Sequence, residues 1–159
     1  SPVPLEAYDD IQGEDTAFLI LGGSANHRKQ AKDYKLRNVK FLDTTSDISL
    51  IHKFLNTLNV YAHGRSDGEQ CSSAIIEGLS HSLPMISHTA ASMGQLEQIG
   101  DAGVVVDGYE EYAQAMKNMM NNKNYYVDCK VNAEKRYREM YNVPSIIKKF
   151  IELYKEVVS

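Results

Sequence analysis

The sequence predicts an α/β fold in which helices flank a parallel β-sheet. Two observations support this prediction. Short apolar runs, such as residues 17–21 and 39–42, alternate with longer segments of helical periodicity, and this alternation is typical of βα units. The last third of the chain shows helical patterns alone. With 159 residues, the chain has the length of one domain with a sizeable core, and no internal boundary is visible.

The first two thirds of the chain are expected to hold the alternating elements. A short helix fits residues 2–11, and the run at 17–21, which ends in Gly22-Gly23, is typical of a buried parallel strand. Ser46 or Asp47 is placed to cap a later helix. The other expected segments are helices over 26–36, 47–58, 73–81 and 93–99, and strands over 39–42, 59–63, 84–88 and 103–106.

The remaining residues predict three helices. Asp107 precedes Glu110 by three residues, as in a capping box, so the first of these helices is expected to start here. A second helix is expected over 125–140, and Pro144 suits the opening turn of the third. Their apolar faces are interpreted as core, and the stripe on the last helix is also a candidate interface. These faces comprise Tyr112, Met116, Met119 and Met120 in the first helix and Ile147, Phe150, Ile151 and Tyr154 in the last.

Composition argues against several classes of protein. The net charge is −4 and no basic run exceeds Lys148-Lys149, whereas nucleic-acid binding requires clustered positive charge. No apolar stretch approaches the ~20 residues of a membrane span, and no signal peptide is visible, so we expect a cytoplasmic protein. Cys71 and Cys129 are far apart and are interpreted as reduced thiols. The histidines lack zinc-ligand spacing, and no metal is expected.

The most informative stretch of the chain runs from residue 58 to residue 81. A predicted strand is followed by a polar, glycine-containing turn and then by a helix that Ser72 or Ser73 can cap. The first turn of a helix offers unpaired N–H groups and a partial positive charge, which suit a phosphate group. Glu69 precedes this helix and Glu77 lies about one turn inside it. The two carboxylates are therefore placed to contact opposite ends of one ligand.

Four motifs along the chain resemble those of the retaining GT-B glycosyltransferases of group 1, the family-4-like class. Glu69 and Glu77, with seven residues between them, resemble the E-x7-E signature of that family. Residues 83–87 resemble its G-x-P-V-I-A strand, residues 94–99 its G-G-x-x-E loop, and residues 100–106 its G-D-A-G-L-L-V strand. The order of the motifs carries the resemblance, because a pair of glutamates at this spacing is common by chance in helical proteins.

The resemblance implies a Rossmann-like domain, the C-terminal donor-binding domain of a two-domain hexosyltransferase. Residues 1–159 would form this single nucleotide-sugar-binding domain. It would bind a UDP- or GDP-sugar and transfer the sugar to an acceptor held by the N-terminal domain of the same enzyme. The resemblance implies no metal or other cofactor, and it is compatible with peripheral membrane association of the full enzyme. A non-catalytic nucleotide-binding or interaction module on the same fold is the alternative.

One strand of the family pattern has no counterpart in this sequence. In the family, the domain begins with a central strand, which is followed by an Arg and a Lys that hold the donor diphosphate. Residues 1–8 match the helix that comes after this strand. The predicted sheet therefore lacks its first, central strand. We interpret the chain as a fragment of a longer enzyme, inactive by itself, and a rearranged fold is the alternative.

The resemblance also implies roles for individual residues. Glu69 would contact hydroxyl groups of the transferred sugar and is the catalytic candidate, whereas Glu77 would accept hydrogen bonds from the ribose hydroxyls. The alternative for each is an exposed carboxylate without a ligand. The backbone N–H groups that would meet the diphosphate are those of Gln70, Cys71, Ser72 and Ser73, where Cys71 and Ser72 replace the Phe and Gly of the family pattern.

The other candidate binding residues follow the predicted strands. Gly22 and Gly23 would let the nucleotide or sugar approach the backbone, or they form a plain βα turn. The loop at Leu42-Asp43 would contact the nucleobase, and Asp43 either binds a base edge or caps a turn. Arg65 is placed to reach a phosphate, with a plain surface arginine as the alternative.

Overall fold

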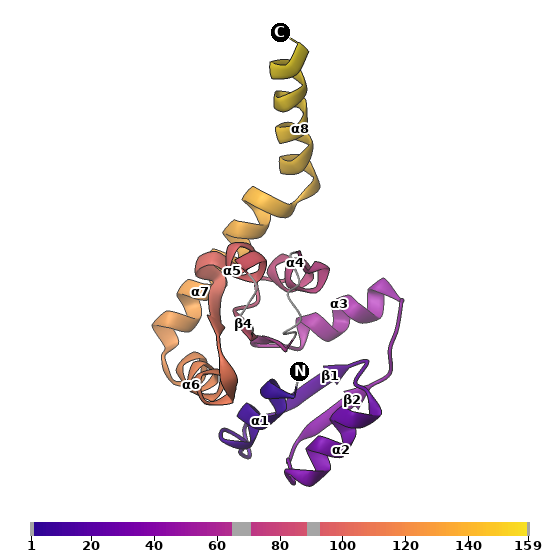
Figure 1. The fold of residues 1–159 in the computed structure, drawn as a ribbon, viewed down its shortest axis with the longest axis vertical. Coiled ribbons are helices and arrows are strands. Elements are labelled where there is room, and N and C mark those ends of the chain that lie inside the picture. Colours follow the sequence, from indigo (N-terminus) through magenta and orange to yellow (C-terminus); the bar gives the residue numbers. More distant parts are fainter. Residues whose placement is uncertain (1, 65–70, 89–92, 159) are drawn as a thin grey trace.

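The computed structural model describes residues 2–64, 71–88 and 93–158 and contains the predicted alternation of strands and helices (Figure 1). The first half comprises α1 (Val3–Asp9), β1 (Phe18–Leu21), α2 (Ala25–Asp33), β2 (Val39–Leu42), α3 (Ile48–Asn56), β3 (Tyr61–His63) and α4 (Ser73–Ser80). The second half comprises β4 (Met85–His88), α5 (Met93–Ile99), the 3-10 turn η1 (Gly100–Ala102), β5 (Gly103–Val106), α6 (Gly108–Asn121), α7 (Lys123–Arg136), the π-helical turn η2 (Tyr137–Tyr141) and α8 (Val143–Val158).

The parallel sheet is divided into two parts. β1 pairs with β2, with Phe18 opposite Val39, and a second part has the order β3-β4-β5, with Tyr61 opposite Met85. In the described part of the chain, no hydrogen-bonded ladder joins β1 to β3. The predicted α/β class with parallel strands is confirmed, and the division falls where the missing central strand is expected.

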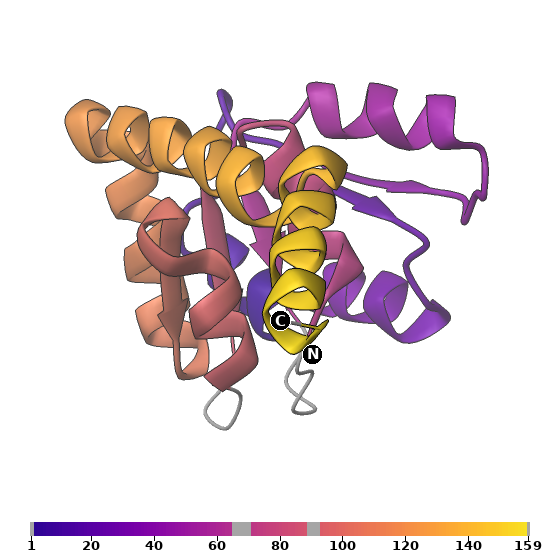
Figure 2. The same cartoon turned by 90° about the horizontal axis from the view of Figure 1, so that it is seen from above.

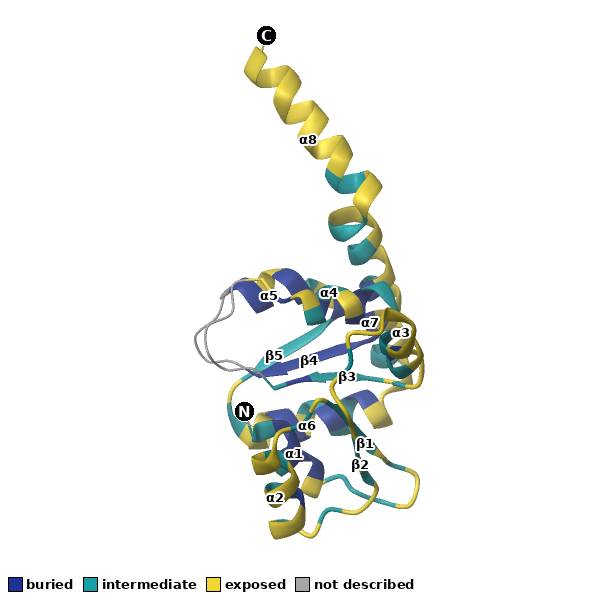
Figure 3. Cartoon of the chain, turned by 90° about the vertical axis from the view of Figure 1, so that its right-hand side faces the viewer, coloured by how far each residue is buried: buried dark blue, intermediate teal, exposed yellow. Residues whose placement is uncertain are grey.

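Helices cover both faces of the β3-β4-β5 part (Figure 3). α4 and α5 pack on one face, and α1 and α6 lie on the other. Adjacent residues of β4 point to opposite faces, so Met85 packs with the α4–α5 side and Ile86 with the α6 side. Figure 2 shows α2 and α3 on one side of the molecule and α6 and α7 on the other.

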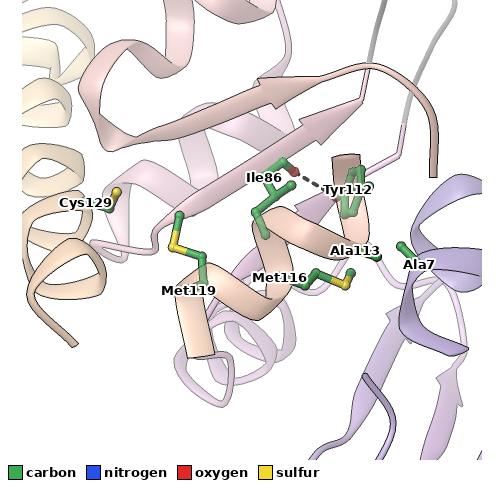
Figure 4. Close-up of a cluster of buried hydrophobic side chains, with 7 residues drawn as sticks. All are labelled: Ala7, Ile86, Tyr112, Ala113, Met116, Met119 and Cys129. Carbon is green, nitrogen blue, oxygen red and sulfur yellow. Dashed lines mark hydrogen bonds between the residues drawn. The ribbon is translucent and has the colours of Figure 1, made fainter. Parts of the chain in front are cut away.

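The cluster beneath the sheet centres on α6 (Figure 4). The buried Tyr112 hydroxyl donates to the carbonyl oxygen of Ile86 at 2.9 Å, and Met116 and Met119 pack around it as predicted. The prediction of a buried Met120 is wrong, because its side chain is 51% exposed. Met120 lies one helical turn after the buried Met116 but borders, with Met116 and Met119, the open cavity beside β1, which leaves its side chain half exposed.

The predicted capping box at the start of α6 is also wrong. The Asp107 side chain caps no backbone group. Instead, the Asp107 N–H donates to the carboxylate of Glu111 at 3.0 Å, one residue beyond the predicted Glu110.

The last helix differs most from its predicted environment. α8 projects away from the rest of the molecule (Figures 1 and 3). The stripe predicted as core is open to solvent, with exposures of 48% to 68% for Ile147, Phe150, Ile151 and Tyr154. The periodicity predicted the helix correctly, but none of the described residues covers this face. None of the described helices has the length and apolar character needed to cross a membrane.

Candidate functional site

The strand and the helix that flank the predicted site are present. β3 ends at His63, and α4 begins at Ser73 with Ser72 at its N-cap position. Three of the predicted site residues, Arg65, Glu69 and Gln70, lie outside the described residues. Their roles remain predictions.

The N-terminus of α4 has no side-chain cap. The predicted capping bond of Ser72 is not formed in the described structure. Because the first N–H groups of a helix have no partner inside it, those at Ser73 and Ala74 are oriented toward the region before the helix. This terminus keeps the donors that an anionic group would require.

The side chain of Gln98 positions the segment that leads into α4. Its Oε1 accepts the Ser72 N–H at 2.7 Å, and its Nε2 donates to the Ser72 carbonyl oxygen at 3.2 Å. The same Nε2 lies 3.3 Å from the Sγ of Cys71. Both Gln98 and Ser72 are buried. In this structure the Ser72 N–H is therefore already engaged by a protein acceptor.

Arg136 supports Gln98 from α7. Its Nε donates to the Gln98 carbonyl oxygen at 2.6 Å, and its Nη2 donates to the Glu97 carbonyl oxygen. The guanidinium group packs over Gly100, where an added Cβ would lie 2.8 Å from Nη1. Gly100 has a φ of +50°. Neither Gln98 nor Arg136 is predicted as a site residue from the sequence, because no spacing pattern links either position to Ser72.

Glu77 shares a cavity with the glycines that follow β1. This cavity has a volume of about 780 Å³, and Gly22, Gly23, Gly64 and Glu77 are among its lining residues. Gly22 and Gly23 follow the carboxyl end of β1, and Gly64 follows that of β3. Among the described residues, no side chain donates a hydrogen bond to the exposed Glu77 carboxylate. The structure thus brings together Glu77 and the glycine pair, which are more than 50 residues apart in sequence.

The loops that follow β1 and β2 lie beside each other. The Gly22 N–H donates to the Leu42 carbonyl oxygen at 3.0 Å, and Gly22 has a φ of +76°. An added Cβ at Gly23 would lie 2.7 Å from the Phe41 ring, so packing by itself requires this glycine. Leu42 and Asp43 are exposed and do not line the cavity that Glu77 shares.

A histidine pair holds the other end of α4. The Nε2 of His81 lies 2.9 Å from the Nδ1 of His52 on α3, and the Nδ1 of His81 lies 2.9 Å from the Glu77 carbonyl oxygen. These contacts tie α4 to α3. Among the described residues there is no group of three or more His, Cys, Asp or Glu side chains arranged to hold a metal ion.

Comparison with known protein families identifies the class of this chain. It belongs to the family described as glycosyl transferases group 1, whose model matches residues 3–136. The resemblance seen in the four sequence motifs is thereby confirmed. No curated protein matches the chain significantly.

Solved structures show the same fold. Anabaena Alr3699/HepE in complex with UDP-glucose superposes with a TM-score of 0.78 at 16% identity, over 97% of this chain and 44% of that one. A glycosyltransferase from Rickettsia africae superposes with a TM-score of 0.76 at 19% identity, over 99% of this chain and 44% of that one. Sucrose-phosphate synthase from Thermosynechococcus elongatus superposes with a TM-score of 0.77 at 19% identity, over 99% of this chain and 42% of that one. The fold is the Rossmann-like domain of the GT-B class, and the chain spans less than half the length of these proteins.

Proposed function

We propose that this protein binds the donor in a retaining group 1 hexosyltransferase. The donor is a UDP- or GDP-sugar, and the sugar passes to an acceptor held by an N-terminal domain of the same enzyme. The observation that carries the proposal is the shared cavity of Glu77 and Gly22-Gly23, beside a helix N-terminus without a side-chain cap. In open parallel sheets, ligands bind outside the carboxyl ends of the strands. The Anabaena protein, solved with UDP and with UDP-glucose, supports this class of donor.

Each residue of the site has one chemical task in this proposal. Glu77 accepts hydrogen bonds from the two ribose hydroxyls, and Glu69 binds hydroxyls of the transferred sugar. The Ser73 N–H and the amides of the preceding loop, Gln70 and Cys71, meet the diphosphate. Gln98 holds the residue before α4 in place through its two hydrogen bonds to Ser72.

The remaining contacts position the two ends of the nucleotide. Gly22 and Gly23 let the donor approach the backbone, the Leu42-Asp43 loop contacts the base, and Arg65 contacts a phosphate. Backbone amides and basic side chains stabilise the leaving diphosphate in place of a metal ion. The full enzyme acts in the cytoplasm, with peripheral attachment to a membrane where the acceptor requires it.

One observation favours a second candidate, a nucleotide-binding module without transferase activity. The Ser72 N–H donates to Gln98, which removes one amide from the set expected to bind phosphate. Such a module would bind the nucleotide through Glu77 and would transfer no sugar. Binding and transfer must therefore be measured separately.

The test uses the full-length protein and isothermal titration calorimetry with UDP-glucose and GDP-mannose as probes. Glu77→Gln should weaken binding of the preferred donor about tenfold or more, because hydrogen bonds to a charged group contribute about 1.5–3 kcal/mol. Glu14→Gln, in the exposed turn before β1, is the control and should bind as the wild type does. Equal affinity of the Glu77→Gln variant and the wild type would refute the proposed site.

A second measurement separates the enzyme from the binding module. Glu69→Ala should abolish release of UDP or GDP in the presence of acceptor while the nucleotide still binds. A wild-type protein that binds the donor and never releases nucleotide in the presence of acceptors would favour the non-catalytic module.

A further inference from the structure

Few side chains hold α3 to the rest of the molecule. Leu55 is the one buried residue of this helix, whereas Ile48 and Leu50 are 68% and 50% exposed. Among the described residues, a single side-chain hydrogen bond joins α3 to a segment distant in the sequence. It links the Nδ1 of His52 to the Nε2 of His81 at 2.9 Å. The position of α3 therefore depends strongly on this pair of imidazole rings.

The hydrogen-bond partners of His81 define which of its nitrogens carries the proton. Its Nδ1 lies 2.9 Å from the Glu77 carbonyl oxygen, which can only accept. In the neutral ring, Nδ1 is therefore the donor and Nε2 the acceptor. It follows that His52 donates through its Nδ1 to His81. A chain of hydrogen bonds thus runs from α3 through His81 to the backbone of Glu77.

The Glu77 carbonyl group belongs to the last turn of α4, where carbonyl groups lack partners inside the helix. The His81 N–H, which would close the usual helical bond to it, donates instead to the Gly78 carbonyl oxygen at 3.1 Å. The His81 ring supplies one replacement donor, and the Ser80 hydroxyl supplies another at 2.7 Å. An imidazole also suits the partial negative charge of a helix C-terminus. The two histidines therefore fix the end of the helix that carries Glu77.

Both helices joined in this way border the cavity of the candidate site. α3 contributes Ile51 and Phe54 to its lining, and α4 contributes Ala74 and Glu77. His52 follows Ile51 directly, so a shift of α3 would move this part of the wall relative to Glu77. A ligand that contacts both helices binds more tightly when they are already held in place, because less ordering remains to be done on binding.

We propose that His52 and His81 are positioning residues for the donor, and we call the pair the histidine clamp. The clamp holds α3 against the end of α4 and so keeps the apolar wall of the cavity in register with Glu77. Neither histidine lines the cavity, so the clamp acts through the two helices and not on the donor itself. Its effect on donor binding rests on the proposed function, whereas the clamp itself requires no ligand.

Protonation of both rings opens the clamp. With one added proton an N–H···N bond remains, whichever ring carries the charge, but with two added protons both facing nitrogens are donors and the bond is lost. Imidazole rings ordinarily titrate near pH ~6.5, so the clamp holds above this range and is lost as pH falls below it.

No charge in the described structure offsets two protons on the clamp. Within the described ranges, neither ring forms an ion pair with a carboxylate. The other charged side chains of the two helices are Lys53 and Glu77. Around α4, the packed elements contribute apolar or phenolic side chains, among them Met85, Ile99, Ala133, Tyr137 and Tyr141. The pH response of the clamp is therefore set mainly by the two rings.

The test uses the full-length protein and calorimetry with UDP-glucose and GDP-mannose, with EDTA present so that no metal ion bridges the two rings. At about pH 7.5, His52→Ala should weaken binding of the preferred donor about two- to tenfold, the effect of losing one neutral hydrogen bond. His52→Asn should restore the affinity, because its side-chain nitrogen replaces Nδ1 as the donor. Asn56→Ala, also exposed on α3, is the control and should bind as the wild type does.

The pH profile distinguishes the clamp from a merely structural role. Affinity of the wild type should fall as pH is lowered from about 7.5 to about 5. The His52→Asn variant should keep its affinity, because the asparagine amide can turn its oxygen toward a protonated His81. In the protein without nucleotide, NMR of the ring nitrogens should place the neutral His81 proton on Nδ1.

Three results would overturn the clamp: a His52→Ala variant that binds as the wild type does, equal pH profiles of the wild type and His52→Asn, or a neutral His81 with its proton on Nε2. The proposed function fails separately. If Glu77→Gln binds normally and His52→Ala binds weakly, the role of Glu77 is wrong and the clamp stands. The reverse result rejects the clamp alone, and a wild type that binds neither donor rejects both.

Discussion

Gln98 and Ser72 form a two-way hydrogen-bonded pair between α5 and the start of α4. The amide oxygen of Gln98 accepts the Ser72 N–H at 2.7 Å, and its amide nitrogen donates to the Ser72 carbonyl oxygen at 3.2 Å. A primary amide is suited to this task because it carries a donor and an acceptor side by side. The pair connects α5, whose sequence resembles the G-G-x-x-E motif, to the helix terminus at which the donor diphosphate is proposed to bind.

Replacement of Gln98 should destabilise the protein measurably. Gln98→Ala leaves the buried Ser72 N–H without a partner, so we expect the free energy of unfolding to fall by about 1–3 kcal/mol. Urea denaturation checks this value. Gln114→Ala, on the exposed side of α6, is the control and should change stability by less than about 0.5 kcal/mol. Equal stability of the two variants would show that the Gln98–Ser72 pair contributes nothing.

The glycine at the start of β5 should tolerate no side chain. A Cβ at Gly103 would lie 1.9 Å from the Met85 carbonyl oxygen, because β4 and β5 approach closely there. Its φ of 169° is ordinary extended backbone, so the obstacle is steric. We expect Gly103→Ala to cost about 1–3 kcal/mol or more in urea unfolding. At Gly13 an added Cβ meets nothing closer than 3.9 Å, and a Gly13→Ala variant as unstable as Gly103→Ala would contradict the steric explanation.

Buried tyrosines should make the protein sensitive to alkaline pH. Burial raises the pKa of Tyr112 well above its usual value, and burial also raises the pKa of Tyr125 to about 12. The folded state therefore holds these phenol protons more tightly than the unfolded state does. Their contribution to stability is complete below about pH 10, where an unfolded tyrosine titrates, and is lost as pH rises toward the folded pKa values.

Urea unfolding between about pH 9 and pH 11 measures this loss. The Tyr112→Phe variant should be less stable at neutral pH by about 1 kcal/mol, because the bond to the Ile86 carbonyl oxygen is lost. Its stability should also fall less steeply with pH than that of the wild type. The exposed Tyr154, replaced by Phe, is the control and should keep the wild-type slope. A Tyr112→Phe variant whose stability falls with pH as steeply as that of the wild type would show that Tyr112 does not cause the loss of stability at alkaline pH.

The two thiols should differ sharply in reactivity. Both cysteines are free, as predicted, but Cys71 is exposed and Cys129 is buried. Burial raises the pKa of the Cys129 thiol, which further lowers its thiolate fraction. In the folded protein we expect Ellman's reagent to modify Cys71 rapidly and Cys129 only after denaturation. A fast phase that persists in the Cys71→Ser variant would show that Cys129 is accessible.

Local patterns predicted most of the elements of this fold. The strands at 39–42 and 103–106 appear with the predicted bounds, since apolar runs between turn residues are visible within a few positions. The positions whose burial was predicted wrongly are those where burial depends on residues far away in the sequence. Met120 follows the buried Met119 and shares its chemistry, and the stripe on α8 has the periodicity of a core helix. Neither pattern carries information on which surface, if any, packs against it.

The sequence by itself determined the group 1 family and the order of the βα units, because motifs and hydrophobic periods are properties of neighbouring residues. Only the tertiary structure decided which polar groups meet. Ser72 and Gln98 are 26 positions apart, and their pairing depends on how α5 packs beside α4. In the same way, Glu77 and the Gly22-Gly23 pair line one cavity only because the two parts of the sheet stand side by side.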